Sequence, residues 1–279
     1  RDCLLSRGLG DVYKRQTYGA TGWWDKSAYK EGMVLGDIWG LQFDRFLTED
    51  DFNADGSLKA GLPDQTKVFP AGYQFAPGDV LYKDLDNNGE IVKQTNTNEK
   101  GDLSVIGNAL PRLQFGLNLD AAWKGFDISM FFQGVAKRKL WAAGNQVLPG
   151  FTTGEPFYKG AEDYWTPENT DAFYPRPMDY KQSASGNYSV NDRYLLNMAY
   201  LRLKTFTVGY SLPKVWLSKF KVQGLRVYFT GENLFTIDGV KPAIDPEIGI
   251  RTAGTSSDQR NFGRSYPYQK TVSFGIQLS

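Results

Sequence analysis

The stretch that decides the fold is RLQFGLNLDAAWKGFDISMFFQG, residues 112–134. Every second residue over 113–123 is apolar and the residues between them are polar or small, which is the period of a strand with one apolar face. Lys124–Gly125 then forms a two-residue turn, where glycine readily takes a positive φ. Trp123 and Phe126 flank this turn on the same face, so the two strands are predicted to pair in register as a hairpin. Each strand has about ten residues, enough to cross a bilayer when tilted.

Similar alternation predicts four further strands. The six predicted strands are 36–46, 112–123, 126–135, 199–211, 224–235 and 268–279. In one of them the apolar positions change phase between Leu203 and Phe206. One extra residue near Lys204–Thr205 would restore a single apolar face, so a β-bulge is predicted there.

The segments between these strands alternate in length. They are long, short, long, medium and long, at 47–111, 124–125, 136–198, 212–223 and 236–267. Outer-membrane barrels have short periplasmic turns and long external loops. The sequence therefore predicts an all-β chain, part of a large transmembrane antiparallel β-barrel with long extracellular loops and a periplasmic C-terminus. The alternative is a soluble carbohydrate-binding β-sandwich, in which the apolar faces would meet in a core.

The barrel interpretation assigns places to particular side chains. Trp123 and Phe126 would lie at the periplasmic interface of the outer membrane, where an aromatic girdle is expected. Arg202 and Lys204 would face the lumen or a rim, because a charge on the lipid face costs about 2–4 kcal/mol at the midplane. A contact with a plug would give them a structural role.

Composition narrows the functional classes. The chain has 279 residues, a net charge of +1, 15% aromatic residues, no histidine and one cysteine, Cys3. The small net charge gives no general reason to expect nucleic acid as a partner. The absence of histidine excludes histidine-dependent catalytic triads and histidine zinc sites. A pair of carboxylates would still suffice for a glycosidase, but Glu162, Asp163 and Glu168 lie in a predicted solvated loop, where acids mostly serve solubility.

The order of the local patterns is more specific than any one of them. EGMVLGDIWGLQFD (31–44) is followed by PGDVLYKDLDNNGEI (77–91), the hairpin, YWTPENTDAFYPRP (164–177) and RVYFTGENLFTI (226–237). This succession resembles the C-terminal barrel part of TonB-dependent outer-membrane receptors of the SusC/RagA type. The resemblance covers nearly all of residues 17–279.

The resemblance implies a function as well as a fold. Such receptors form barrels of about 22 strands around an N-terminal plug. They import oligosaccharides or peptides across the outer membrane of Gram-negative bacteria, are not enzymes, and work with a SusD-type surface lipoprotein. The TonB complex would act through an N-terminal region that this chain lacks, and outer-membrane lipid would surround the barrel.

The two ends of the sequence are unusual. Residues 1–16, RDCLLSRGLGDVYKRQ, show no strand or helix period and resemble translated adapter sequence. We interpret them as a non-native lead and residues 17–279 as the barrel part, without a plug domain. Barrels of the family commonly end in an aromatic residue, whereas this sequence ends in Leu278–Ser279, so a further aromatic residue is expected after it.

The stretch DLDNNGEI, residues 84–91, matches the first half of a calcium loop. Position 12 of such a loop should be a bidentate glutamate, but Thr95 stands there, so an EF-hand is excluded. Two interpretations stay open: a turn held by Asp and Asn side chains, or a site for Ca²⁺ or Mg²⁺, which prefer oxygen ligands. The candidate metal ligands are Asp84, Asp86, Asn88 and Glu90.

Aromatic residues are frequent in the long connection 136–198. Aromatic rings that face an external vestibule can stack on sugar rings, whereas buried rings only keep a long loop ordered. The candidate substrate-binding residues are Trp141, Tyr158, Tyr164 and Trp165.

Overall fold

The computed structural model describes residues 34–93, 101–142, 144–151, 157–178, 186–218, 222–241, 244–247 and 267–279. The predicted non-native lead, Thr95 and the predicted terminal residue lie outside this part. The chain divides into two compact units. Unit 1 comprises 1–110, 139–196 and 249–265, and unit 2 comprises 111–138, 197–248 and 266–279.

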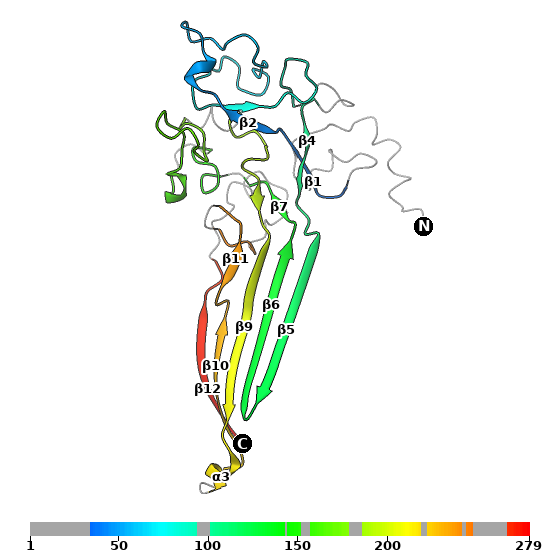
Figure 1. Ribbon diagram of the computed structural model, residues 1–279, viewed down its shortest axis with the longest axis vertical. Helices are drawn as coiled ribbons and strands as arrows, with labels where there is room; N and C mark the ends of the chain where they lie inside the picture. Colours follow the sequence, from blue (N-terminus) through cyan, green and yellow to red (C-terminus); the bar gives the residue numbers. More distant parts are fainter. Residues whose placement is uncertain are drawn as a thin grey trace, which may run out of the picture. The chain divides into compact units, whose positions relative to one another are not determined.

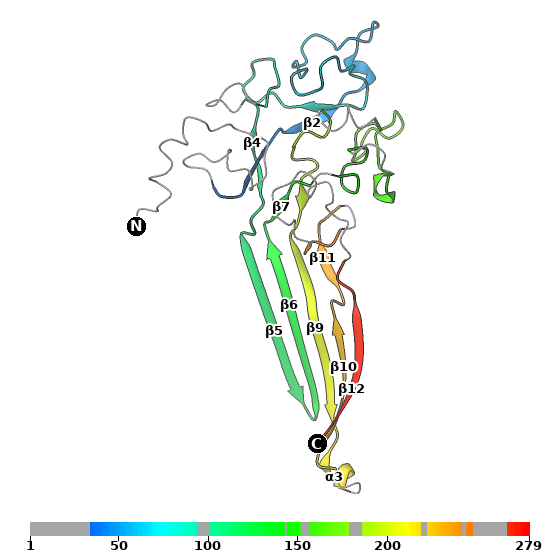
Figure 2. The same cartoon turned by 180° about the vertical axis from the view of Figure 1, so that it is seen from behind.

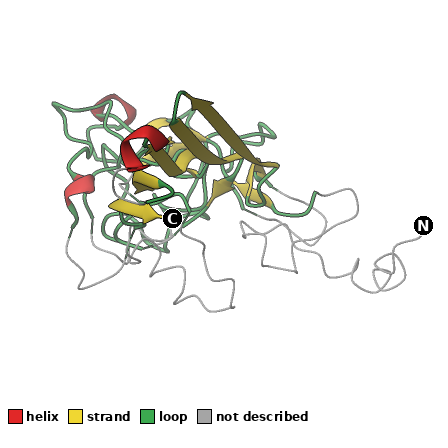
Figure 3. Cartoon of the chain, turned by 90° about the horizontal axis from the view of Figure 1, so that it is seen from below, coloured by secondary structure: helices red, strands yellow, loops and turns green. Residues whose placement is uncertain are grey.

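Helical structure is confined to short turns in the described part (Figure 3). These turns are the 3₁₀ helices η3 (Glu49–Asp51) and η4 (Lys159–Ala161) and the helix α3 (Lys214–Leu217). None of the helices described is long and apolar enough to span a membrane.

Unit 2 is built on one antiparallel sheet. Its strands are β5 (Leu113–Trp123), β6 (Phe126–Ala136), β9 (Tyr200–Ser211), β10 (Leu225–Glu232), β11 (Thr236–Asp238) and β12 (Thr271–Leu278). The strand order is β12-β10-β9-β6-β5, and β11 pairs with β9 beside β10. The five long strands lie side by side in both views (Figures 1 and 2).

The predicted hairpin is confirmed. Trp123 pairs with Phe126, and the register continues without a shift to Leu113 opposite Ala136. Lys124 and Gly125 both have positive φ, 48° and 91°, as a tight two-residue turn requires. A side chain at Gly125 would also begin 2.9 Å from the Ser211 carbonyl oxygen, so the turn needs glycine for two reasons.

The predicted β-bulge is also confirmed. On β9, Thr205 is opposite Phe131 and Leu203 is opposite Phe132, so Lys204 is the extra residue. The bulge brings Leu203 and Phe206 onto the same face of the sheet, as the change of phase in the sequence required.

One face of this sheet is apolar and exposed. Exposed fractions there run from 36% at Ile128 to 82% at Phe274. The face includes Leu113, Phe115, Leu117, Leu119, Trp123, Phe126, Ile128, Val227, Val272, Phe274, Ile276 and Leu278. The opposite face carries paired polar groups, including Arg226 on Asp127 and Thr207 on Thr230. The alternation is the one expected between lipid and lumen in a barrel wall.

Unit 1 contains three two-stranded sheets. They pair β1 (Asp37–Gly40) with β4 (Ser104–Asn108), β2 (Phe43–Phe46) with β3 (Val80–Tyr82), and β7 (Lys139–Leu140) with β8 (Leu196–Asn197). A buried core joins segments far apart in sequence, including Leu41, Val80, Leu103 and Trp165. The predicted long loops therefore have a core of their own.

The prediction of one long strand over 36–46 is wrong. The chain leaves its pairing with β4 after Gly40, and the Leu41 N–H donates to the carbonyl of Val190 at 2.9 Å. Gly40 permits this approach, because a Cβ there would lie 2.8 Å from the same carbonyl oxygen. Ile38 and Leu41 are buried at 1% and 0% exposure, and the successive residues Gly40 and Leu41 are both buried, so burial here does not alternate with the period of two of a barrel strand.

Candidate functional site

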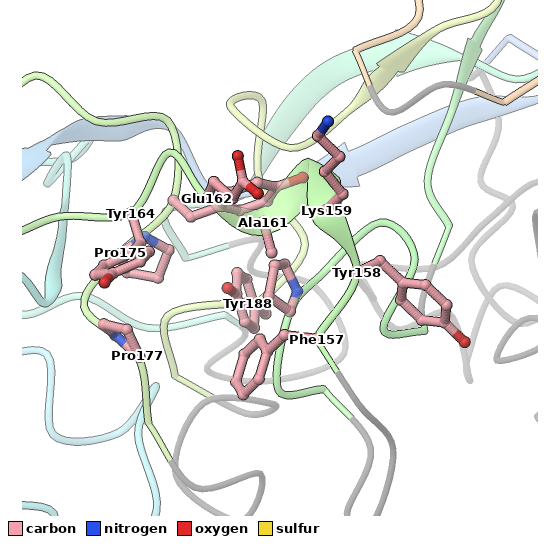
Figure 4. A pocket seen from close by; sticks show the side chains of 11 residues that line it. Phe157, Tyr158, Lys159, Ala161, Glu162, Tyr164, Pro175, Pro177 and Tyr188 are labelled. Carbon is pink, nitrogen blue, oxygen red and sulfur yellow. The ribbon is translucent and has the colours of Figure 1, made fainter.

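A pocket of about 390 Å³ in unit 1 is lined mainly by aromatic and proline residues (Figure 4). All of its walls come from the connection between β7 and β8: two main segments, and the single residues Pro149 and Tyr188. The lining residues are Pro149, Phe157, Tyr158, Lys159, Ala161, Glu162, Tyr164, Tyr174, Pro175, Pro177 and Tyr188.

A short backbone ladder holds the two main segments together. The N–H of Trp165 donates to the Tyr174 carbonyl at 3.0 Å, and the N–H of Tyr174 donates to the Asp163 carbonyl at 2.9 Å. The Asp163 carboxylate accepts from the Asn169 amide at 3.3 Å and from the Phe173 N–H at 3.1 Å. The loop between the segments is thus closed by its own polar groups, which fixes the pocket walls without a long strand.

Two of the lining residues are buried tyrosines that pack against the interior of unit 1. Tyr174 and Tyr188 are 4% exposed, and both pack on Tyr194, Tyr174 in a stacked and Tyr188 in an edge-on arrangement. The Tyr174 hydroxyl donates to the Val147 carbonyl at 3.0 Å. Burial raises the pKa of Tyr174 to about 12, so its hydroxyl stays protonated and keeps this bond.

The rim of the pocket is exposed. Phe157, Tyr158 and Tyr164 are 57%, 37% and 40% exposed. In Figure 4 the Tyr164 ring lies beside Pro175, whereas Tyr158 extends away from them. Flat apolar surfaces with Lys159 and Glu162 nearby suit a ligand that offers both C–H surface and hydrogen-bonding groups.

The structure divides the four predicted substrate residues into two pairs. Tyr158 and Tyr164 line the pocket, whereas Trp141 and Trp165 are each 7% exposed. Trp165 packs so closely over Gly78 that a Cβ there would lie 2.5 Å from its ring. Little of either tryptophan ring is open to a ligand in the described part of the chain. Phe157 belongs to the same aromatic-rich connection but was not among the four candidates, and it lies at the rim. The sequence reasoning missed the prolines beside it, although the motif YPRP (174–177) holds two of them.

Two of the acids near the pocket have different surroundings. Glu162 lines the pocket, but Asp163 is engaged with Asn169 and Phe173 as described. The geometry thus assigns Asp163 to the loop and leaves Glu162 as a polar group on the pocket wall.

The 84–91 loop also lies in unit 1, and its Asp84 and Asp86 are close to Asp102. One carboxylate oxygen from each of the three residues lies within 4.8 Å of the corresponding oxygens of the other two. Asp84 Oδ2 accepts from the Gly89 N–H at 2.7 Å, while its buried Oδ1 has no hydrogen-bond partner. Burial raises the pKa of Asp102, and the nearby Asp86 and Asp84 add to the rise. Three close carboxylates with one unpaired oxygen fit a hard divalent cation.

Two of the predicted metal ligands are used differently. The Glu90 carboxylate pairs with Lys67, and Asn88 Oδ1 accepts from the Glu90 N–H at 2.7 Å. Asp102 was not among the predicted ligands, and no motif spacing connects it to the loop. Asp102 lies just before β4, at the end of the connection that follows β3. Its two oxygens accept from the N–H groups of Leu85 and Val92, each at 2.8 Å.

The relatives of this chain are receptors. TonB-dependent receptor P3 of Formosa agariphila is 29% identical over 99% of this chain, and TonB-dependent receptor SusC of Bacteroides thetaiotaomicron is 24% identical over 83%. The chain is homologous to part of the TonB-dependent receptors of the SusC and RagA type. No protein-family model matches it.

The homology to the TonB-dependent receptors covers only part of their length. The chain spans 24% of receptor P3 and 22% of SusC. Among solved structures, the RagAB peptide importer in its closed-closed state aligns with 87% of this chain and 23% of its own, at 21% identity and a TM-score of 0.53. The RagAB peptide transporter aligns likewise, at 20% identity and the same TM-score. The antiparallel sheet therefore corresponds in fold to part of such a receptor, and TonB-dependent receptors are outer-membrane transporters, not enzymes.

Proposed function

We propose that the chain forms part of the wall and external loops of an outer-membrane importer for oligosaccharides or peptides, which depends on TonB for energy. The observation that carries the proposal is the exposed apolar face of the six-stranded sheet, with a polar face behind it. Exposing such a face to water costs free energy, whereas contact with lipid does not. The homology to TonB-dependent receptors supports the same assignment.

In this proposal the sheet has a fixed orientation. The β5–β6 turn and the C-terminal end of β12 lie on the periplasmic side, so Trp123 and Phe126 meet the inner interface. The long connections then face outward and hold the aromatic pocket. A SusD-type surface lipoprotein would act with the receptor there, as the name RagAB implies for two proteins that work together.

The aromatic pocket is the proposed contact for the imported solute. Tyr158 and Tyr164 would stack on a sugar ring or on an apolar side chain of a peptide, and Lys159 and Glu162 would hydrogen-bond to it. Trp141 and Trp165 would support the loop that carries these residues.

The experiment is uptake by cells that carry the full-length receptor as their only copy. We expect Tyr164→Ala to weaken uptake of the natural solute by about 5–30-fold, equivalent to 1–2 kcal/mol of lost contact. Tyr164→Phe keeps the ring and serves as the matched control. Equal uptake by cells with the wild-type receptor and by cells without it would refute the transport function. Equal uptake by cells with Tyr164→Ala and by cells with the wild-type receptor would refute only the role of the pocket.

A second proposal concerns the 84–91 loop. Asp84, Asp86 and Asp102 would hold Ca²⁺ or Mg²⁺, and the Asn88 side chain, which donates to Asp86 Oδ2 at 3.0 Å, lies beside them. The unpaired Asp84 Oδ1 supports this. The cation would stiffen an external loop and take no part in chemistry.

A further inference from the structure

A second pocket, of about 520 Å³, lies in unit 2 on the polar face of the sheet. Its polar lining comes from one end of β5, β6 and β9, from Arg138 just after β6, and from two segments of the connection between β11 and β12. The side chains used in the argument are Gln114, Gln133, Arg138, Tyr200, Glu247 and Tyr268. Gln114 and Tyr200 are both register partners of Val135, which places them on one face.

The acids of this region are already paired. Arg202 is 3% exposed, and its guanidinium contacts Asp245 Oδ1 at 2.6 Å and also Glu247. Lys204 Nζ lies 2.9 Å from the same Glu247 oxygen. The Tyr200 hydroxyl donates to the other Glu247 oxygen at 2.9 Å. Two cations thus balance two carboxylates, as a buried ionic network requires.

Arg138 is the cation left over. Its Nε is buried and has no hydrogen-bond partner, and over the described part of the chain no carboxylate forms an ion pair with it. Burial lowers the pKa of Arg138, and only the nearby Tyr200 opposes this. A partly buried guanidinium without an anion is costly.

The surrounding groups suit a planar anion. A guanidinium binds a carboxylate through two parallel N–H···O bonds. The Gln114 amide lies on the same wall, and the Gln133 amide, which donates to the Tyr200 hydroxyl at 3.4 Å, is beside it. The pocket volume is sufficient for a carboxylate and the group that carries it.

We propose that this pocket binds a carboxylate group through Arg138. The carboxylate comes either from an acidic solute on its way along the polar face or from a side chain in another part of the receptor. The proposal rests on the proposed function only in taking this face as the barrel interior. Thermal stability reports on the pocket itself, whereas uptake reports on transport, so the two can fail separately.

The test compares Arg138→Gln with Lys137→Gln in the full-length receptor in detergent. Lys137 is the exposed neighbour, so this control removes the same charge outside the pocket. Melting temperatures are measured with sodium galacturonate or sodium glutamate, and with galactose or glutamine plus the same concentration of NaCl.

An acidic solute as the source predicts that the two carboxylates, unlike their neutral counterparts, raise the Tm of the wild type and of Lys137→Gln by about 2 °C or more. Arg138→Gln would lose this rise. A receptor carboxylate as the source predicts instead that Arg138→Gln melts below Lys137→Gln without any added solute. Either pattern supports the proposal. An Arg138→Gln receptor that melts at or above Lys137→Gln, with no carboxylate-specific rise in the wild type, overturns it.

Discussion

Asp84 shows how one atom changes the interpretation of a loop. One oxygen of this carboxylate accepts from the Gly89 N–H. Burial opposes the ionised form, but this bond and the backbone N–H groups of Asn87 and Asn88 help to lower the pKa of Asp84. The other oxygen is nevertheless buried and makes no hydrogen bond of normal geometry. A turn alone gives no reason for an unpaired buried oxygen, because such a group costs about 1–3 kcal/mol. A bound cation would supply the missing partner.

We therefore expect Asp84→Asn to weaken cation binding by the full-length receptor at least about tenfold, the effect of losing about 1.4 kcal/mol. The asparagine can still accept from Gly89, so the turn is kept. Binding is measured by the luminescence of Tb³⁺ and by its displacement with Ca²⁺ or Mg²⁺.

Glu90→Gln is the control for this experiment. It removes a charge from the same loop, but Glu90 is paired with Lys67 and lies outside the Asp84, Asp86 and Asp102 cluster. Equal losses in both variants would indicate general electrostatic attraction. Unchanged Tb³⁺ binding in Asp84→Asn would leave the turn as the only role of the loop.

At the scale of single residues, the sequence indicated which types of side chain could form a site, but not which of those side chains would be buried. Tyr158 and Trp165 belong to one aromatic-rich segment and looked equivalent, yet one lies at a rim and the other in a core. Asp102 could not be found because it meets Asp84 through tertiary folding, with no motif between them. Arg202 and Lys204 were predicted to face away from lipid, and both reach Glu247 on the polar face.

At the scale of elements, the strands of the sheet were predictable because each alternates against a single boundary between apolar and polar surroundings. The extra residue at Lys204 was visible for the same reason, since it interrupts a strict period of two. The short strands of unit 1 gave no such signal. Their stability comes from distant partners, such as buried Asp79, which accepts from Arg176 at 2.9 Å and from the Asn187 amide at 3.0 Å.

Deleting Lys204 should preserve the match between β9 and its neighbours. Without the extra residue, Leu203 stays opposite Phe132 and Thr205 stays opposite Phe131, so Arg202 keeps the polar side. We expect the full-length receptor with this deletion to remain in the outer-membrane fraction on immunoblots. Deleting Val208 from the regular part of the strand would instead move Phe206 to the polar side and Thr207 to the lipid side, and should remove the receptor from that fraction. Loss of the Lys204 deletion variant from the membrane would contradict the assignment of Lys204 as the extra residue.

The lipid face of β5 makes a second prediction at this scale. Leu117→Lys places a charge on the exposed apolar face and should destabilise the folded receptor by about 2–4 kcal/mol near the midplane. Asn118→Lys adds the same charge to the next residue, which points to the polar face, and should have little effect. The measurement is the urea midpoint of the receptor in lipid vesicles, where equal midpoints for both variants would argue against a lipid-facing β5.

At the scale of the whole molecule, the long strands and the exposed apolar face have one common consequence. The outer strands β5 and β12 each have one unpaired edge in the described part of the chain, and unpaired edges beside an apolar face promote association with other chains. We expect the 279-residue chain, produced alone and refolded in detergent-free buffer, to give aggregates by size-exclusion chromatography with light scattering. A stable soluble monomer would mean that the apolar face is covered without lipid. That result would favour the carbohydrate-binding β-sandwich, because in a sandwich the same alternation of residues closes a core against water.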